Sequence, residues 1–352
     1  MRVLFLQQQP CTRALKYGAA LRALDAASLR LGFAYRGVTL SSLYGSGDEL
    51  FESWWRLDGS PAAMLRTALA DFRPDVIHSH NLPDSLTVLA LELTGGRIPV
   101  IHDVHDFQSL RRTPYEDGFP EPNDPLGLER RAVEDCAALV TVSDELLAEI
   151  GARHRLPARA LVFPNYALRR DLPKTVRVPR RLEGRPRLVY QGTLSTNGGH
   201  YDLRELFAAI VEQGVQLHVY PGRPVEDYDD LGIRLHDTLP PAALLRELTS
   251  YDLGWAGFNE RLNAAHLDTV LPNKAFEYIG CGLPVVTLRH RALSRFVDEQ
   301  GLGISLDSVD DLARALETVD LLALRRRVAA ARFQFTVESK VAELRELYAD
   351  LA

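Results

Sequence analysis

One short segment, LPNKAFEYIGCGLPVV at 271–286, combines residue types that suit an anionic ligand. Pro272 is typical of a helix start, Lys274 follows in the first turn, and Glu277 comes three residues later. Two glycines and a proline then end the helix before a strand. A helix N-terminus with a lysine attracts phosphate, and a carboxylate one turn further on can accept hydrogen bonds from a ribose diol. The pattern suits a sugar nucleotide, although an ordinary capped helix with a surface Lys–Glu pair would look the same.

Polar residues also end two apolar runs in the first half of the chain. His105 follows the run 99–104 between Asp103 and Asp106, and the run from residue 76 ends in His80 and Asn81. A carboxylate beside a histidine can orient its ring. In parallel sheets, ligands bind at the carboxyl ends of the strands, which is where these residues would lie. A histidine satisfied inside the core is the competing interpretation.

The elements that would position these residues are short apolar runs alternating with helical patterns, which is typical of βα units and a parallel sheet. The pattern occurs twice and is interrupted by a stretch rich in proline, arginine and lysine. The sequence therefore predicts an α/β protein with a first domain at 1–168, a linker at 169–186, a second domain at 187–330 and a C-terminal helix at 331–352. The natural ligand site for two such domains is the cleft between them.

Composition excludes several classes of protein. The 352 residues suffice for about two domains, and 46% hydrophobic with 25% charged residues is ordinary for a globular chain. The net charge of −6 argues against a nucleic-acid partner. The three cysteines form no CxxC pair, so a reducing, cytoplasmic compartment is expected and a zinc site is not. No secretion signal or membrane-spanning run is evident.

Six motifs in order make the chain resemble the GT-B glycosyltransferases, specifically the retaining group called family 4 (glycosyl transferases group 1). The resemblance covers most of the chain. Its strongest motif is the segment at 271–286, and the others are RPDVIHSHN (73–81), PVIHDVHDF (99–107), ALVTVSDELLAEI (138–150), LVFPNYA (161–167) and RLVYQGTLS (187–195).

The resemblance implies a GT-B fold, with two Rossmann-like doubly wound domains facing a central cleft and a last helix that packs back on the first domain. It implies a hexosyltransferase that moves a sugar from a nucleoside diphosphate to an acceptor hydroxyl with retention at the anomeric carbon. No cofactor and no metal are expected. The pair Asp229–Asp230 reads as a polar turn rather than a metal site.

Roles for the donor site carry over position by position. Glu277 matches the glutamate that holds the nucleotide ribose, and Asn273 and Lys274 lie in the same donor-binding turn. Gly192 and Thr193 begin the loop under the donor phosphates.

Roles for the first domain carry over in the same way. His105 matches the histidine near the reacting sugar, and Asp106 accompanies it as a catalytic candidate. His80 and Asn81 are assigned to the acceptor side.

Three departures from the family pattern matter. Thr269 stands where many members have the first glutamate of an E-x7-E pair. The loop after residue 191 lacks the usual arginine and lysine, so phosphate charge must be met by Lys274 or by Arg223. The loop after the first strand lacks a double glycine and has only Gly18, which could still let a helix N-terminus approach the donor phosphates or the acceptor.

Other functions remain open from sequence. A nucleotide-sugar epimerase or hydrolase on the same fold, a non-enzymatic sugar-binding protein and a catalytically degenerate sugar-nucleotide-binding protein are the alternatives. The acceptor is a saccharide, a lipid-linked sugar or a small molecule, and peripheral contact with the inner face of the membrane is left open. Trp54 and Trp55 could stack on a sugar or touch a lipid surface, or pack in the core.

Overall fold

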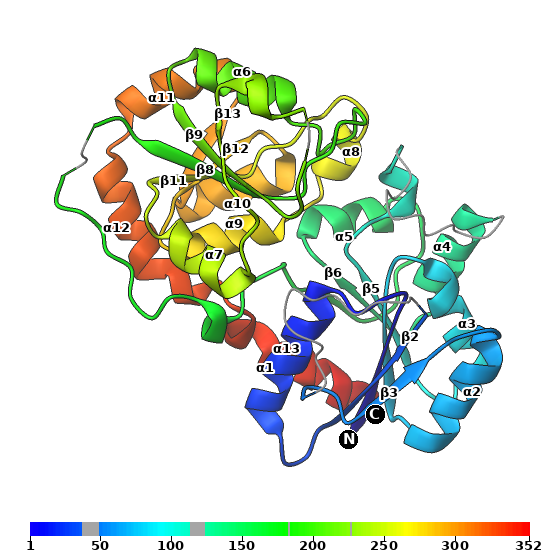
Figure 1. Cartoon of the computed structure of the whole chain (residues 1–352). Helices are drawn as coiled ribbons and strands as arrows, with labels where there is room; N and C mark the ends of the chain where they lie inside the picture. Colours follow the sequence, from blue (N-terminus) through cyan, green and yellow to red (C-terminus); the bar gives the residue numbers. More distant parts are fainter. Residues whose placement is uncertain (37–48, 113–123, 182–183, 226) are drawn as a thin grey trace. The chain divides into compact units, whose positions relative to one another are not determined.

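The computed structural model describes residues 1–36, 49–112, 124–181, 184–225 and 227–352, and these form two compact units (Figure 1). The predicted α/β class with two Rossmann-like doubly wound domains is confirmed. The first unit comprises Met1–Ser109, Pro114–Pro164 and Val337–Ala352, and the second comprises Leu110–Thr113 and Asn165–Thr336.

The first unit contains a parallel sheet of seven strands in the order β3-β2-β1-β4-β5-β6-β7. The middle residues of β1, β2 and β6 are apolar and buried, as expected for strands covered by helices on both faces, while β4 and β5 also bury polar residues such as His78 and Asp103. From β1 the chain adds strands toward one edge of the sheet (β2, β3) and then, from β4, toward the other edge. This switch of direction lies between β1 and β4, which pair in parallel. The strands are β1 (Arg2–Gln7), β2 (Arg30–Tyr35), β3 (Ser53–Arg56), β4 (Val76–His80), β5 (Val100–Val104), β6 (Ala138–Thr141) and β7 (Ala160–Val162).

Capped helices connect these strands. Ser60 accepts a hydrogen bond from Ala63 N at the start of α2, and Ser143 accepts one from Leu146 N at the start of α5. The helices of this unit are α1 (Thr12–Asp25), α2 (Pro61–Phe72), α3 (Asp84–Thr94), the short η1 (Gln108–Leu110), α4 (Pro125–Glu134), α5 (Asp144–Gly151) and α13 (Val337–Leu351).

Strand β3 was not expected, because its polar surroundings suggest a loop. Its two tryptophans pack within the unit: the Trp54 ring stacks on Phe33 with centroids 5.1 Å apart, and Trp55 meets Phe72 edge-on at 5.5 Å. Aromatic residues favour such half-buried strand positions. Core packing therefore accounts for both tryptophans.

The second unit contains a parallel sheet of six strands in the order β10-β9-β8-β11-β12-β13. The strands are β8 (Arg187–Gly192), β9 (Gln216–Pro221), β10 (Arg234–Leu235), β11 (Leu253–Trp255), β12 (Val285–Leu288) and β13 (Gly303–Leu306). The helices are η2 (Arg169–Asp171), α6 (Arg204–Glu212), η3 (Asp229–Leu231), α7 (Pro241–Leu248), α8 (Ala264–Leu267), α9 (Asn273–Gly280), α10 (Arg291–Gln300), η4 (Val309–Asp311), α11 (Leu312–Thr318), α12 (Leu321–Ala331) and η5 (Arg332–Gln334).

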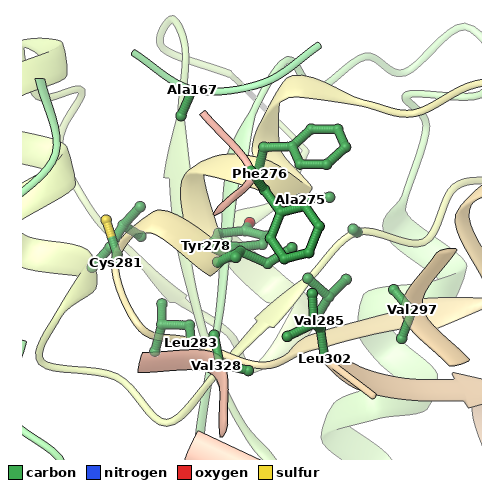
Figure 2. Close-up of a cluster of buried hydrophobic side chains, with 14 of the residues drawn as sticks. Ala167, Ala275, Phe276, Tyr278, Cys281, Leu283, Val285, Val297, Leu302 and Val328 are labelled. Carbon is green, nitrogen blue, oxygen red and sulfur yellow. The ribbon is translucent and has the colours of Figure 1, made fainter. Parts of the chain in front are cut away.

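Helix α9 lies directly on the sheet of the second unit. Figure 2 shows its side chains Ala275, Phe276 and Tyr278 among the buried residues that follow it in β12 and beyond. A Cβ at Gly254 of β11 would come 2.3 Å from the Tyr278 ring, so only glycine allows this close approach. The Tyr278 hydroxyl also accepts a hydrogen bond from Gln191 N at 2.9 Å. Packing thus fixes the position of α9 against β8 and β11.

The C-terminal helix predicted at 331–352 is observed as α13, which begins six residues later, at Val337, and follows the separate helix α12. Helix α12 belongs to the second unit and α13 to the first, where it packs on α1. The Tyr348 hydroxyl lies 2.6 Å from His78 Nδ1, and Arg345 donates to the Asp25 carboxylate at 3.0 Å. The last helix is therefore tied to β4 and α1 by polar contacts as well as by burial.

Candidate functional site

Lys274 is buried near the start of α9, with 7% of its surface exposed. Its Nζ donates a hydrogen bond to the Tyr190 hydroxyl at 3.0 Å and lies 4.1 Å from the centre of the Tyr190 ring and 4.6 Å from that of Phe258. Aromatic faces attract such a cation. Burial lowers the pKa of Lys274 to about 7, and the Glu277 carboxylate only partly opposes this effect.

The backbone turn after β8 runs past this ammonium group. Gly192 has a φ of 127°, and a Cβ there would lie 3.6 Å from Lys274 Nζ. The Tyr190 hydroxyl donates to Thr193 O at 2.5 Å, and Gly222 N donates to Gly192 O at 2.9 Å. Thr193 itself is exposed. The structure thus places an exposed backbone turn beside a buried amine, and the expectation that Gly192, Thr193 and Lys274 lie together agrees with these distances.

Glu277 stands one turn further along α9 and is half-buried. Gln191, at the end of β8, donates from Nε2 to Glu277 Oε2 at 2.5 Å. Sequence reasoning missed Gln191, although its position directly before Gly192 was a usable signal. The pair brings a carboxylate to the carboxyl end of β8, where ligands of such sheets bind.

The start of α9 and the loop after β9 complete this group. Pro272 is the N-cap residue of α9, and its side chain makes no cap hydrogen bond. Asn273 follows it and is half-buried. Arg223 is exposed in the loop after β9, next to Gly222. Helix N–H groups, the Lys274 amine and an arginine are the groups that bind phosphate.

The missing glutamate at position 269 is not replaced by its neighbour. Thr269 is buried, and its hydroxyl donates to His266 O at 2.8 Å. The Asp268 carboxylate instead accepts a hydrogen bond from Arg291 N at 3.0 Å, which caps α10. The carboxylate nearest in sequence is therefore used for structure.

In the first unit, His105 and Asp106 follow β5 and are half-buried. Within the described part of the chain, His105 Nδ1 is buried without a hydrogen-bond partner. Burial lowers the pKa of His105, and the Asp106 and Asp103 carboxylates oppose this effect. A neutral imidazole can donate a hydrogen bond from one ring nitrogen and accept one at the other.

Asn81 lies inside the first unit, with 1% of its surface exposed. Its Oδ1 accepts hydrogen bonds from His105 N at 3.1 Å and Asp106 N at 3.4 Å, and its Nδ2 donates to Asp106 O. Asn81 N also donates to Asp103 O at 3.0 Å. The structure therefore places this side chain against the backbone of the His105 loop.

His80 is fully buried and its ring stacks on His78 with centroids 4.4 Å apart. Burial holds the pKa of His80 well below its usual value. The ring lies in the core of the first unit, so contact with an acceptor would need the core to open. We therefore assign His80 to the packing beneath the His105 loop.

Asp103 shares this interior with a buried arginine. Arg13 Nε lies 3.0 Å from both Asp103 oxygens, and His78 Nε2 lies 3.2 Å from one of them. Burial alone would raise the pKa of Asp103, but the Arg13 guanidinium holds it far below its usual range. The atoms of His78, His80 and Asp103 are close enough to share a metal ion. However, Arg13 already neutralises the carboxylate. The planes of the stacked His78 and His80 rings are only 8° apart, so the lone pairs of the two rings lie in nearly parallel planes and do not converge on one metal ion.

The expected role of Gly18 is wrong. Helix α1 begins at Thr12, so Gly18 lies in its middle rather than at its N-terminus. A Cβ at Gly18 would come 2.7 Å from the Phe51 ring. The glycine is therefore needed for packing inside the first unit and not for phosphate contact.

A cavity of about 580 Å³ in the second unit contains none of the expected site residues. It lies at the amino ends of β8, β9 and β10 and is lined by turn glycines and by Arg185, Arg187 and Arg234. Ligands of open α/β sheets bind at the opposite, carboxyl ends. We therefore place the candidate donor site around Lys274.

Two family models match successive parts of the chain. Residues 2–166 match the glycosyl transferase 4-like domain, and residues 198–339 match the C-terminal domain of glucosyltransferase 3-like proteins. No curated protein matches the sequence. Within the described residues, no helix is both long and apolar enough to cross a membrane.

Solved structures with the same fold include several glycosyltransferases. Sucrose-phosphate synthase from Thermosynechococcus elongatus is 14% identical with a TM-score of 0.69, covering 100% of this chain and 99% of that one. WaaG, a glycosyltransferase involved in lipopolysaccharide biosynthesis, is 13% identical with a TM-score of 0.66 (98% and 99% covered). HepE from Anabaena, in complex with UDP, is 13% identical with a TM-score of 0.67 (99% and 100% covered).

At these identities the solved structures establish the fold, while the two family models together account for most of the sequence. The chain therefore belongs to the GT-B glycosyltransferases of the family-4-like group.

Proposed function

We propose that the protein is a hexosyltransferase that moves a sugar from a nucleoside diphosphate to an acceptor hydroxyl with retention at the anomeric carbon. The observation that carries the proposal is the buried amine of Lys274 beside the exposed Gly192–Thr193 turn, with Glu277 one helical turn away. Glycosyl transfer leaves a diphosphate, and preorganised positive groups stabilise such a leaving group. HepE, which has the same fold, was solved in complex with UDP, and this supports a nucleotide as the ligand.

Each residue of the second unit has a defined task in this proposal. The Lys274 ammonium and the N–H groups around Asn273 bind the diphosphate, with Arg223 reaching it from the neighbouring loop. The Gly192–Thr193 backbone lets the phosphates approach closely, since no Cβ intervenes at Gly192. Glu277 accepts hydrogen bonds from the ribose hydroxyls while Gln191 holds its other side.

His105 and Asp106 are the proposed polar groups at the reacting sugar. A neutral His105 donates or accepts one hydrogen bond with a sugar hydroxyl, and Asp106 orients the ring. Because Lys274, Arg223 and helix N–H groups supply positive charge for the diphosphate, we propose that the reaction needs no divalent metal. The acceptor class stays open among saccharides, lipid-linked sugars and small molecules, and a lipid-linked acceptor would require peripheral contact with a membrane.

Nucleotide binding by the full chain tests the donor site. Isothermal titration with UDP, GDP, dTDP and ADP in the presence of EDTA is expected to show binding of at least one nucleotide. Glu277→Ala should weaken this binding by about 1.5–3 kcal/mol, the usual range for a hydrogen bond to a charged group. Glu317→Gln, an exposed change on α11, is the matched control and should leave affinity unchanged.

Turnover distinguishes the alternatives. With the nucleotide sugar identified by titration, NMR of the product gives the anomeric configuration and shows whether an acceptor is required. Release of free sugar or an isomerised donor without acceptor would replace transfer with hydrolysis or epimerisation. Absence of binding by any nucleotide, or an unchanged affinity in Glu277→Ala, would refute the proposed donor site around Lys274 and Glu277.

A further inference from the structure

The segment from His105 to Ser109 is fixed at both ends by buried side chains from other elements. At its start, Asn81 makes three side-chain hydrogen bonds, to His105 N, Asp106 N and Asp106 O. At its end, Glu129 of α4 accepts from Ser109 N at 2.8 Å and from the Ser109 hydroxyl. Both side chains are 1% exposed, so water has little access to the polar atoms of Asn81 and Glu129.

The two ends are supported differently. The carboxamide of Asn81 accepts from two N–H groups with its oxygen and donates to a carbonyl with its nitrogen, which an aliphatic side chain cannot do. The carboxylate of Glu129 also lies 2.9 Å from His154 Nε2, which follows α5. Phe107, in the middle of the segment, is 1% exposed and meets the His154 ring edge-on. The backbone between His105 and Ser109 is therefore held by three different parts of the first unit.

We propose that Asn81 is a positioning residue, which fixes the backbone of His105 and Asp106 and so sets where the His105 ring meets the donor sugar or the acceptor. Glu129 fixes the backbone at Ser109, the other end of the segment, in the same way. The role of His105 in this inference rests on the proposed function. The hydrogen bonds of Asn81 to the backbone of His105 and Asp106, here called the backbone clamp, do not depend on that function. Asn81 thus acts through its neighbours and touches no substrate.

Catalytic groups must be held closely, because a misplacement of about 1 Å lowers rates by about 100-fold. Asn81→Ala removes all three side-chain bonds at once, and His105 N and Asp106 N then lose their buried acceptor. We expect kcat to fall by about 100-fold, while nucleotide affinity, which is a property of the second unit, stays within error of the unchanged protein.

Asn81→Asp keeps an acceptor for both amides and loses the bond to Asp106 O. We expect it to retain more kcat than Asn81→Ala does. Thr94→Ala is the matched control: it removes a similarly buried side-chain-to-backbone hydrogen bond, to Leu91 O at the end of α3, and should change neither quantity.

Hydrogen exchange read by mass spectrometry supplies a measurement that does not depend on turnover. In Asn81→Ala, amide exchange should accelerate in the peptide that contains residues 105–109 and stay unchanged elsewhere in the first unit. If Asn81→Ala does not fold, amide exchange at residues 105–109 and kcat are compared in Asn81→Asp and Glu129→Gln instead. Unchanged exchange at 105–109, or faster exchange with unchanged kcat, would overturn the positioning role. Faster local exchange in a protein that binds no nucleotide would instead retain the clamp and refute the proposed function.

Discussion

At the scale of single residues, Lys274 defines the candidate donor site. An ammonium removed from water is destabilised unless it gains a partner. Among the described residues, Lys274 Nζ contacts a tyrosine hydroxyl and aromatic rings, and the Glu277 charge only partly offsets the effect of burial. A diphosphate at the Gly192 turn would supply the missing negative charge. A bound anion would thus stabilise the charged form of Lys274.

Donor affinity should therefore depend on pH. In the free protein Lys274 loses its proton as the pH rises through about 7, whereas the bound diphosphate favours the charged form. Above that pH, binding takes up a proton, so affinity should fall by up to about tenfold per pH unit. Titrations between pH 7 and 9, in buffers of different ionisation enthalpy, measure both the affinity and the proton uptake.

The matched variant for this test is Lys274→Met, which keeps the length of the side chain and removes the charge. Its affinity should be lower at pH 7 and nearly constant up to pH 9. A slope in Lys274→Met equal to that of the unchanged protein would assign the pH dependence to another group.

Sequence reasoning finds such residues only in part. The spacing of Lys274 and Glu277 within one short helix was visible, because both lie in a single local motif. The contact between Gln191 and Glu277 and the backbone clamp by Asn81 join residues 86 and 24 to 25 positions apart. No local pattern predicts these contacts, since they depend on which strands become neighbours in the sheet.

At the scale of elements, the close approach of α9 to β11 positions Lys274 and Glu277, the residues of the candidate donor site. The local apolar patterns predicted most strands and helices, but the predicted last helix begins at residue 331, whereas α12 ends at Ala331 and α13 begins at Val337. Directly after α12, the Arg332 side chain donates to Gly280 O at 2.7 Å and Lys174 O at 2.8 Å. A local helical pattern does not reveal these contacts, because their partners lie 52 and 158 positions away in the sequence.

A methyl group at Gly254 should disturb α9. Gly254→Ala places a Cβ 2.3 Å from the Tyr278 ring, and overpacking of this kind destabilises a core by about 1–3 kcal/mol. Urea unfolding measures the loss, and nucleotide affinity should fall as well because α9 carries Lys274 and Glu277. In the double variant Gly254→Ala/Tyr278→Leu the smaller side chain should relieve the clash, so the two losses should not add. Additive losses would show that the clash is not their cause.

At the scale of the whole molecule, each unit has its own sheet and buried core. Residues such as Leu4, Ile77 and Val100 form part of the core of the first unit, while Val189, Tyr278 and Val285 belong to the second. A ligand that binds only one unit should stabilise that unit by RT ln(1 + [L]/Kd), about 2.7 kcal/mol at 100-fold excess over Kd.

The tightest nucleotide should therefore slow amide exchange in the second unit selectively. The amides of β8, β11 and α9 are expected to gain protection, while those of β1 and β4 serve as the internal comparison. Exchange followed by mass spectrometry with and without nucleotide reads both units in one sample. Equal protection in both units would refute donor binding by the second unit alone.

The contact between Tyr348 and His78 also bears on how the chain is made. A ribosome adding about 5–20 residues per second completes residues 1–164 and must then synthesise the whole of 165–336 before α13 emerges. For about 10 to 30 seconds the α1 face that receives α13 therefore stays uncovered on the nascent protein. The later-synthesised unit is consequently the first that can finish folding, and a chaperone that shields nascent apolar surfaces would be expected to engage the earlier one.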